Sequence, residues 1–285
     1  MFQQFHLHLP SKENKIYNFR KLNKIKNFNI VCFKILILCF TFISTNAFGY
    51  YENYYYEVQF GNLIVGKAEI SIEKNSNEIK LKTKSQTAGF LNAFYEYNGE
   101  LYSSSIKKKK IWTPKIFSTK GIFNNKIRIS IINWKDNNLV EYKNDPILDL
   151  TKVHNIDQST LKEVIDPVTA FINIVEEINL TERCDKSFRI FDGRRRYDLQ
   201  VKSLGNTFLI NDRPKSFNGN TLICGLKIIP LGGHRLETKW KPKEDKFSDF
   251  KIFFGTISSG RLLPVRMNLE RWFGTVTVRL IGNNL

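Results

Sequence analysis

From residue 54 onwards, apolar and polar residues alternate with a period of two along most of the chain. The stretch Tyr54–Phe60, with the sequence YYYEVQF, shows this pattern, and polar turns separate it from similar stretches downstream. A period of two places successive side chains on opposite faces, which is typical of half-buried β-strands. The pattern predicts strands over Tyr54–Phe60, Leu63–Ile72, Ile79–Thr87, Phe94–Ser105, Lys115–Phe123, Ile127–Trp134, Asn138–Lys143, Ser187–Phe191, Arg194–Lys202, Thr207–Ile210, Asn220–Pro230, Arg235–Trp240, Asp249–Phe254, Leu262–Leu269 and Gly274–Ile281.

Short turns join these strands. Asn124-Asn125 and Asp136-Asn137-Asn138 are hairpin-turn candidates, because Asn and Asp tolerate the positive φ that tight hairpin turns require. Consecutive strands with short connections indicate an antiparallel meander rather than the βαβ alternation of a nucleotide-binding sheet. We expect a mainly β fold, in which the meander forms a curved sheet, a half-barrel or a sandwich with one helix inserted near the middle.

The inserted helix is predicted to begin at Asp166-Pro167. Asp is a favoured N-cap, and proline at the first helical position loses no hydrogen bond. Val168, Phe171, Ile172 and Val175 then recur at helical spacing and predict one apolar face. We expect the helix to lie across the mouth or one face of the sheet.

The N-terminal residues 1–47 have the order of an export signal. A basic stretch precedes the apolar run Ile30–Ser44, and small residues ending at Ala47 follow it. We predict cleavage after Ala47 and localisation in the periplasm. The alternative is an uncleaved membrane anchor, since a run counted from Ile30 that tolerates Lys34 is nearly long enough to span a bilayer. Residues 48–285 would then form a single β-rich domain, with residues 145–180 as the one candidate seam.

The charge of the chain is strongly positive, with 44 Lys and Arg against 27 Asp and Glu and a net charge of +17. Without residues 1–47, which hold seven Lys or Arg and one acid, 37 basic and 26 acidic residues remain, a net charge of +11. Such an excess attracts anionic partners, among them lipid head groups and acidic glycans. We expect no nucleic-acid partner, because the chain is exported and carries no recognition motif.

Two of the four cysteines, Cys32 and Cys39, lie in the predicted leader, which leaves Cys184 and Cys224. An exported domain with one even pair usually closes a disulfide. A bridge across 40 residues would stabilise the fold by about 3 to 4 kcal/mol in the chain-entropy model. The alternative is a reactive thiol, although the chain has no CxxC motif.

The densest polar motif is Phe191–Asp198, with the sequence FDGRRRYD. Asp192-Gly193 fits a tight turn, and on a following strand Arg194 and Arg196 would share one face while Arg195 takes the other. Two interpretations remain open, since the arginines could pair with nearby carboxylates or bind an anionic ligand bidentately. The candidate ligand-binding residues of this region are Arg194, Arg195, Arg196, Asp192, Asp198 and Asp166.

Two histidines, His154 and His234, remain outside the leader. His234 follows Gly232 and Gly233, which permit close backbone approach, so it is the better pocket candidate and the seventh candidate ligand-binding residue. The alternative is an exposed loop histidine. The sequence contains no nucleophile elbow, no zinc-protease motif and no P-loop. We therefore assign no catalytic residue, no metal and no cofactor.

Several motifs occur in a characteristic order along the chain. They are Tyr56-Glu57-Val58, Gly61, Val65-Gly66, Thr87–Phe90 (TAGF), Asp166–Ala170 (DPVTA), Cys184-Asp185, Phe191–Asp198 (FDGRRRYD), Cys224, Pro264-Val265-Arg266 and Phe273-Gly274. In this order the sequence resembles the DUF3108 family of exported bacterial proteins, whose function is uncharacterised. The resemblance implies a β-rich envelope protein of half-barrel or sandwich type, and it assigns no reaction.

These observations favour an exported periplasmic protein that is not an enzyme and that binds an amphiphilic or anionic envelope component. A lipid, a glycolipid or an anionic glycan would fit the positive charge and the aromatic-rich strands. One alternative is an enzyme that acts on envelope polysaccharide or lipid through acidic residues such as Asp166, Asp192 and Asp198. A second alternative is a structural partner of another envelope protein.

Overall fold

The structure is a computed structural model that describes residues 49–237, 246–271 and 274–284. The predicted export signal, residues 1–47, lies outside these residues, as does the part of the predicted strand Arg235–Trp240 beyond Glu237. Phe48–Leu285 form one compact unit. In the described ranges, no helix is long and apolar enough to cross a membrane.

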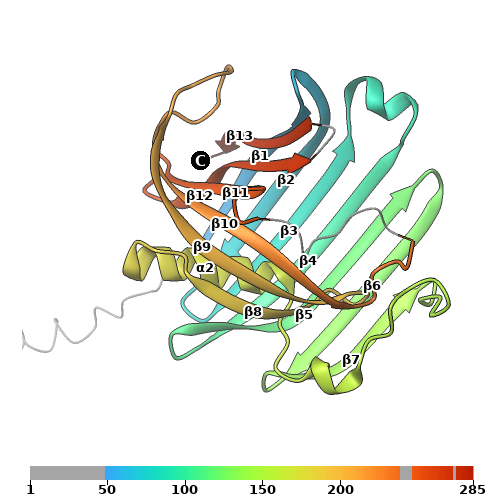
Figure 1. The fold of residues 1–285 in the computed structure, drawn as a ribbon. Coiled ribbons are helices and arrows are strands. Elements are labelled where there is room, and N and C mark those ends of the chain that lie inside the picture. Colours follow the sequence, from blue (N-terminus) through green and yellow to red (C-terminus); the bar gives the residue numbers. More distant parts are fainter. Residues whose placement is uncertain (1–48, 238–245, 272–273, 285) are drawn as a thin grey trace, which may run out of the picture. The chain divides into compact units, whose positions relative to one another are not determined.

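The described residues form one antiparallel sheet of 13 strands, curved and unclosed (Figure 1). Its spatial order is β7-β6-β5-β4-β3-β2-β1-β13-β12-β11-β10-β9-β8, so the first strand pairs with the last and the two edges, β7 and β8, come from the middle of the chain. The strands are β1 (Tyr50–Phe60), β2 (Leu63–Lys74), β3 (Glu78–Thr87), β4 (Tyr97–Lys108), β5 (Ile111–Phe123), β6 (Lys126–Lys135), β7 (Asn138–Asp145), β8 (Lys186–Phe191), β9 (Arg196–Leu209), β10 (Gly219–Gly232), β11 (Phe250–Thr256), β12 (Leu262–Arg271) and β13 (Gly274–Asn284).

This architecture confirms the predicted fold class and resolves its alternatives, since the described strands make one curved sheet and not two stacked sheets. The predicted hairpin turns are also confirmed. Asn124 and Asn125 have φ of 45° and 63°, and Asp136 and Asn137 have φ of 51° and 68°. Positive φ at both central residues matches the right-handed twist of the flanking strands.

Several predicted strands have different bounds in the structure. Arg194–Lys202 and Thr207–Ile210 are parts of the single strand β9, and the residues between them form a bulge at Gly205, where φ is +101°. Phe94 belongs to the connection before β4, which contains the short 3-10 helix η2 (Gly89–Ala93). Of the predicted strand Arg235–Trp240, the described part forms only an isolated bridge, between Arg235 and Val153.

The α-helix of the described residues, α2 (Pro167–Thr181), lies on the concave side of the sheet. It contacts β4 and β5 from one half and β8 and β12 from the other, which is feasible only from inside the curve (Figure 1). The expected position of the helix on one face of the sheet is therefore confirmed. Of the predicted apolar face only Ile172 is buried, and Val168, Phe171 and Val175 are half-buried, because the helix packs against strands on several sides. The buried residues are Thr169, Ala170, Ile172, Ile174 and Ile178.

Asp166 is the N-cap of α2, as predicted. Its carboxylate accepts the backbone N–H groups of Val168 and Thr169, at 2.9 and 3.0 Å, and the hydroxyls of Thr169 and of Ser103 on β4. The group is fully buried, and this desolvation raises its pKa, although the hydrogen bonds act in the opposite direction. Asp166 thus fastens the start of the helix to the inner face of the sheet.

The buried position of Asp166 predicts a pH effect. A carboxyl group whose pKa is raised by folding contributes stability below its unfolded pKa of about 4, and that contribution is lost as the pH rises through the folded pKa. Asparagine keeps the cap and carries no charge. We therefore expect urea unfolding to show that Asp166→Asn gains stability relative to the unsubstituted protein as the pH is raised from about 4 to about 8.

Asp157 provides a control of opposite sign. It is the exposed N-cap of the 3-10 helix η3 (Gln158–Leu161), and hydrogen bonds from Ser159 lower its pKa. Asp157→Asn should lose stability relative to the unsubstituted protein as the pH rises to about 4, the unfolded pKa, and the difference should then stay constant up to about pH 8. Equal pH profiles for the two variants would contradict the assignment of a buried, proton-stabilised carboxyl to Asp166.

Candidate functional site

The turn between β8 and β9 contains the middle of the FDGRRRYD motif. The Asp192 carboxylate accepts the backbone N–H groups of Arg194 and Arg195 at 2.9 and 2.7 Å, and Gly193 takes a φ of +89°. The turn reaches the opposite edge of the sheet, because Asn144 on β7 donates its side-chain N–H to the Gly193 carbonyl at 2.7 Å. The predicted Asp192-Gly193 turn is confirmed, whereas the strand begins only at Arg196, so Arg194 and Arg195 do not take the alternating strand positions expected of them.

Arg194 bridges the two edges of the unclosed sheet. Its guanidinium donates to the Ser130 hydroxyl at 3.2 Å and to the carbonyls of Ile129, Asp145 and Pro146 at 3.0 to 3.3 Å. All four acceptors belong to β6, β7 or the residue after β7, while Arg194 belongs to the β8–β9 turn. This side chain therefore joins the edges where no strand pairing does.

The Arg196 guanidinium also forms its hydrogen bonds within the protein. It is 2% exposed and donates to the Thr160 carbonyl at 3.0 Å, to the Tyr197 carbonyl at 2.6 Å and to the Asp198 carboxylate at 2.7 Å. The interpretation of arginine–carboxylate pairing therefore holds for Arg196 and Asp198. These contacts fix the segment before α2 against β9.

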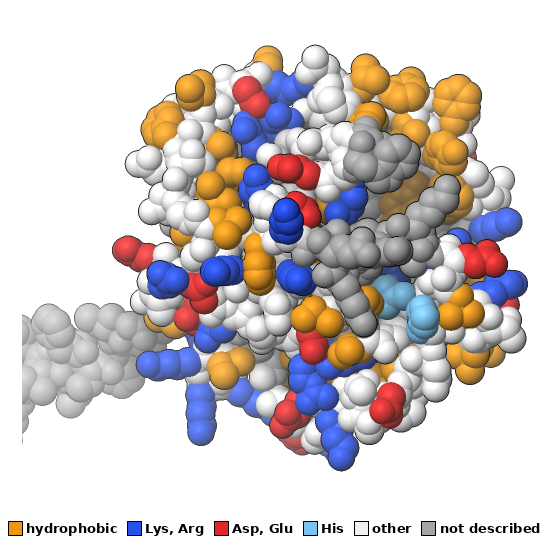
Figure 2. All heavy atoms as spheres, in the orientation of Figure 1, with side chains coloured by type: hydrophobic (Ala, Val, Ile, Leu, Met, Phe, Trp, Pro, Cys, Tyr) orange, Lys and Arg blue, Asp and Glu red, His pale blue; other side chains and the backbone are white. Residues whose placement is uncertain are grey.

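A cavity of about 1280 Å³ lies beside the Arg194 bridge, and we call it the basic groove. It is built from the start of β6, the chain that follows β7, the β8–β9 turn, and the end of β10 with the residues after it. In Figure 2 its two histidines, in pale blue, lie next to each other on the visible face. The lining residues are Arg128, Pro146, Ile147, Leu148, Asp149, Thr151, Lys152, Val153, His154, Asn155, Arg194, Arg195, Pro230, Leu231, Gly232, Gly233, His234, Arg235, Leu236 and Glu237.

Backbone pairing holds the floor of the basic groove together. The N–H of His154 donates to the His234 carbonyl at 2.8 Å, and the N–H of Gly233 donates to the His154 carbonyl at 2.7 Å. Glycine is required here, because Gly233 has a φ of +75° and a Cβ atom would collide with the Arg194 carbonyl oxygen. The close approach expected beside His234 is therefore present.

The charges of the basic groove are mostly positive. Four arginines and one lysine line it, against the two acids Asp149 and Glu237. Arg195 is the arginine of the motif that stays open to solvent, since its side chain is 59% exposed and its guanidinium lies 3.9 Å from the Asp192 carboxylate. Burial and the neighbouring Arg195 lower the pKa of His234, which keeps this imidazole neutral at pH 7.

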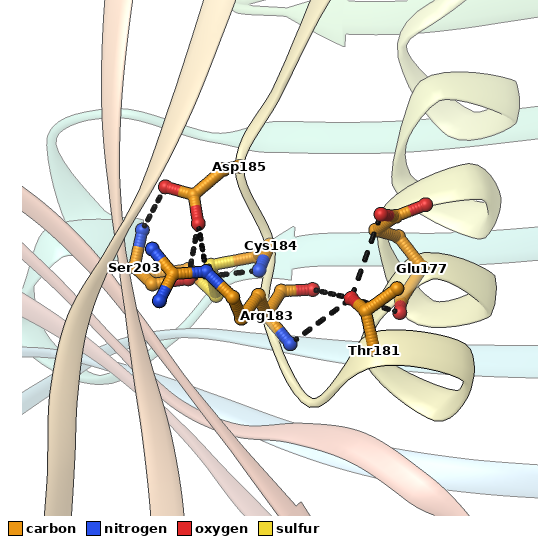
Figure 3. Close-up of a disulfide and its surroundings, with 7 residues drawn as sticks. Glu177, Thr181, Arg183, Cys184, Asp185 and Ser203 are labelled. Carbon is orange, nitrogen blue, oxygen red and sulfur yellow. Dashed lines mark hydrogen bonds and ion pairs between the residues drawn. A yellow bond between two sulfur atoms is a disulfide. The ribbon is translucent and has the colours of Figure 1, made fainter.

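The disulfide lies on the concave side, at the exit of α2. Cys184 and Cys224 are bonded, with their Cα atoms 6.2 Å apart, so the predicted disulfide is confirmed. Figure 3 shows Cys184 between the end of the helix and β9, where its N–H donates to the Ser203 hydroxyl at 2.9 Å. Asp185 accepts the N–H and the hydroxyl of Ser203 and pairs with Arg183, which orders the chain around the bridge.

A family model described as "Protein of unknown function (DUF3108)" matches residues 55–281. The chain belongs to the DUF3108 family. No curated protein matches this DUF3108 chain significantly. Among solved structures, one match is the crystal structure of a beta-barrel-like protein of the domain of unknown function DUF1849 from Brucella abortus, which is 8% identical, covers 82% of this chain and 97% of that chain, and has a TM-score of 0.47.

The fold of this DUF3108 chain separates the seven predicted site residues. Arg194, Arg195 and His234 line the basic groove, and Asp192 orders the turn that carries two of them. Arg196 and Asp198 form their ion pair outside the lining, and Asp166 caps the helix. No cluster of three or more His, Cys, Asp or Glu suited to a metal ion occurs among the residues that the structure describes.

Sequence reasoning did not select four Arg, Lys or His residues of the basic groove: Arg128, Lys152, His154 and Arg235. Arg128 is one of many basic residues on predicted strands, so its residue type alone does not indicate that it lines a cavity. His154 and Arg235 come together through the bridge between Val153 and Arg235, which joins segments about 80 residues apart. A single sequence does not reveal such a pairing.

Proposed function

We propose that this protein is exported to the periplasm and, without catalysing a reaction, binds an anionic amphiphile of the cell envelope in the basic groove. The observation that carries the proposal is the mixed lining of the groove, where exposed guanidinium groups lie next to exposed apolar side chains. The order of basic, apolar and small residues before Phe48 supports export. The Cys184–Cys224 disulfide supports an oxidising compartment.

The basic side supplies the head-group contacts. Arg194 is committed to four acceptors of the protein, whereas Arg195, Arg128 and Arg235 are exposed and line the same cavity. Guanidinium groups bind phosphate and carboxylate oxygens through paired N–H donors. An anionic head group would therefore lie at the Arg195 side of the basic groove.

The apolar side of the basic groove supplies the contacts with the hydrocarbon chain of the ligand. Ile147 is 87% exposed, and Leu231 and Leu236 are about half exposed on the facing segment. Exposed apolar side chains next to basic groups are typical of a surface that covers a hydrocarbon chain on binding. A ligand with only a charged group would leave these residues in water.

The enzyme alternative has less support from the geometry. Asp192 accepts backbone N–H groups, Asp198 binds Arg196 and Asp166 binds Thr169 and Ser103, so the three acids considered for it have no hydrogen-bond partner in common. Acid–base hydrolysis of a glycoside needs two carboxyl groups that flank one bond. The observed placement of these three acids therefore favours binding over hydrolysis.

The binding proposal predicts a preference for decyl phosphate. The full chain should bind this probe below its micelle concentration more tightly than inorganic phosphate or uncharged decyl glucoside. Arg195→Ser combined with Arg235→Ser should weaken the binding of decyl phosphate about tenfold, because each guanidinium supplies a charge-assisted, partly exposed contact. Isothermal titration calorimetry measures both effects.

Lys82→Ser combined with Lys84→Ser is the matched control, since it removes two exposed positive charges from β3, away from the basic groove. This control should retain the affinity. Equal losses in both double variants would reduce the effect to net charge and contradict a site at the groove. The proposal also fails if protein purified from the envelope retains no lipid by native mass spectrometry and envelope lipid extracts leave its melting temperature unchanged.

A further inference from the structure

Exposed apolar side chains, most of them aromatic, gather at one end of the strands, on or beside the connections β1–β2, β3–β4 and β5–β6. Their exposed fractions lie between 38% for Tyr97 and 70% for Phe94. In Figure 2, hydrophobic side chains gather at the upper right, where Figure 1 draws the β3–β4 connection. We call this surface the aromatic rim, and its residues are Leu63, Phe90, Phe94, Tyr95, Tyr97, Phe123 and Ile127.

Hydrogen bonds hold the aromatic rim in this outward position. The N–H of Tyr95 donates to the Leu91 carbonyl at 2.8 Å, and the N–H of Tyr97 donates to the Thr87 hydroxyl at 3.0 Å. Two connections are joined, because the N–H of Asn124 donates to the Glu96 carbonyl at 3.0 Å. The aromatic side chains are thus presented to solvent by an ordered backbone.

The three connections are nearly uncharged. Residues 61–63, 88–97 and 123–127 contain only Glu96 and Lys126 as charged side chains, in a chain with 25% charged residues. Burying them in an apolar environment therefore costs little desolvation of charge. The side chains project from three separate turns, a shape that suits insertion among lipids better than a flat contact with a folded partner.

We propose that the aromatic rim inserts into the interface of a lipid bilayer. Phenylalanine supplies apolar area, and tyrosine places its ring in the bilayer and its hydroxyl in the head-group layer, as aromatic residues do at membrane interfaces. The net charge of +11 outside the leader complements an anionic membrane. Arg128 follows Ile127 directly and lines the basic groove, so the docked protein holds the groove beside the head groups.

The test places a reporter in the aromatic rim of the full chain. In Phe94→Trp, the added indole should enter the bilayer of vesicles made of phosphatidylglycerol and phosphatidylcholine. Its emission, taken as the difference from the unsubstituted protein, should shift to the blue, and brominated lipids should quench it about twofold. Trp112 and Trp134 are buried, Trp240 and Trp272 lie outside the described residues, and the difference from the unsubstituted protein removes the signal of all four.

Ile111→Trp is the matched control. Ile111 is 62% exposed, similar to the rim residues, and lies at the start of β5, at the opposite end of that strand from the β5–β6 connection. Its emission should not respond to the vesicles. Both variants carry the same N-terminal residues, so any contribution of residues 1–47 to membrane binding is equal in the two.

An unquenched indole in Phe94→Trp, and likewise in the second reporter Phe90→Trp, would overturn the proposal. So would an indole that becomes protected only through self-association of the protein in sedimentation experiments. The proposal goes beyond ligand binding in the basic groove and can fail independently of it. Arg195→Ser combined with Arg235→Ser should weaken the binding of decyl phosphate about tenfold and leave the quenching in Phe94→Trp intact.

Discussion

Replacing both Cys184 and Cys224 with alanine should lower the free energy of unfolding by about 3 to 4 kcal/mol, because the unfolded chain regains the freedom of a 40-residue loop. Both cysteines are fully buried in the core cluster that packs α2 against β8 to β11. The bridge joins the exit of α2 to β10, so its loss should loosen the helix first. Urea unfolding followed by circular dichroism measures the change.

Reduction separates the covalent effect from the effect of the substitutions. The unsubstituted protein in dithiothreitol should approach the stability of Cys184→Ala combined with Cys224→Ala, and the reductant should leave the double variant unchanged. A loss below about 1 kcal/mol on reduction would contradict the structural role of the bridge. Because the bond persists only under oxidising conditions, chain retained in the cytosol should have the lower stability.

The parts of the fold that could be predicted are those determined by residues close together in the sequence. Period-two alternation located the strands, and paired Asn and Asp residues located the tight turns Asn124-Asn125 and Asp136-Asn137. The helix start followed from the cap Asp166 and the proline after it. The disulfide followed from a count, since two of the four cysteines lie in the predicted export signal and a single pair remains.

The parts that were not predictable depend on contacts between distant segments. Three consecutive arginines have the same chemistry in sequence, yet Arg194 bridges two sheet edges, Arg196 is buried against Thr160 and Arg195 stays open to solvent. Their roles depend on β6 and β7 lying opposite the β8–β9 turn, and a single sequence contains no signal for that pairing. For the same reason the basic groove was not predicted as a unit.

Arg194→Leu should destabilise the protein by about 1 to 3 kcal/mol, because it removes the charge-assisted hydrogen bonds to the partly buried Ser130 hydroxyl and Ile129 carbonyl. The carbonyls of Asp145 and Pro146 are exposed and can bond to water instead. The substitution also removes one of the links between the edges of the unclosed sheet and leaves the bond from Asn144 to Gly193. We expect a lower urea midpoint, and faster amide hydrogen exchange in β6 and β7 before global unfolding.

Arg195→Leu is the matched control, because it removes the same charge from the next residue of the same turn. The side chain of Arg195 is 59% exposed, and its contact with Asp192 is long, at 3.9 Å. Such a surface contact contributes about 0 to 1 kcal/mol, so Arg195→Leu should unfold close to the unsubstituted protein. Equal destabilisation by the two variants would mean that the turn as a whole, and not the Arg194 guanidinium, holds the edges together. A large difference would assign the contact between the two sheet edges to Arg194 and leave Arg195 available to the ligand of the basic groove.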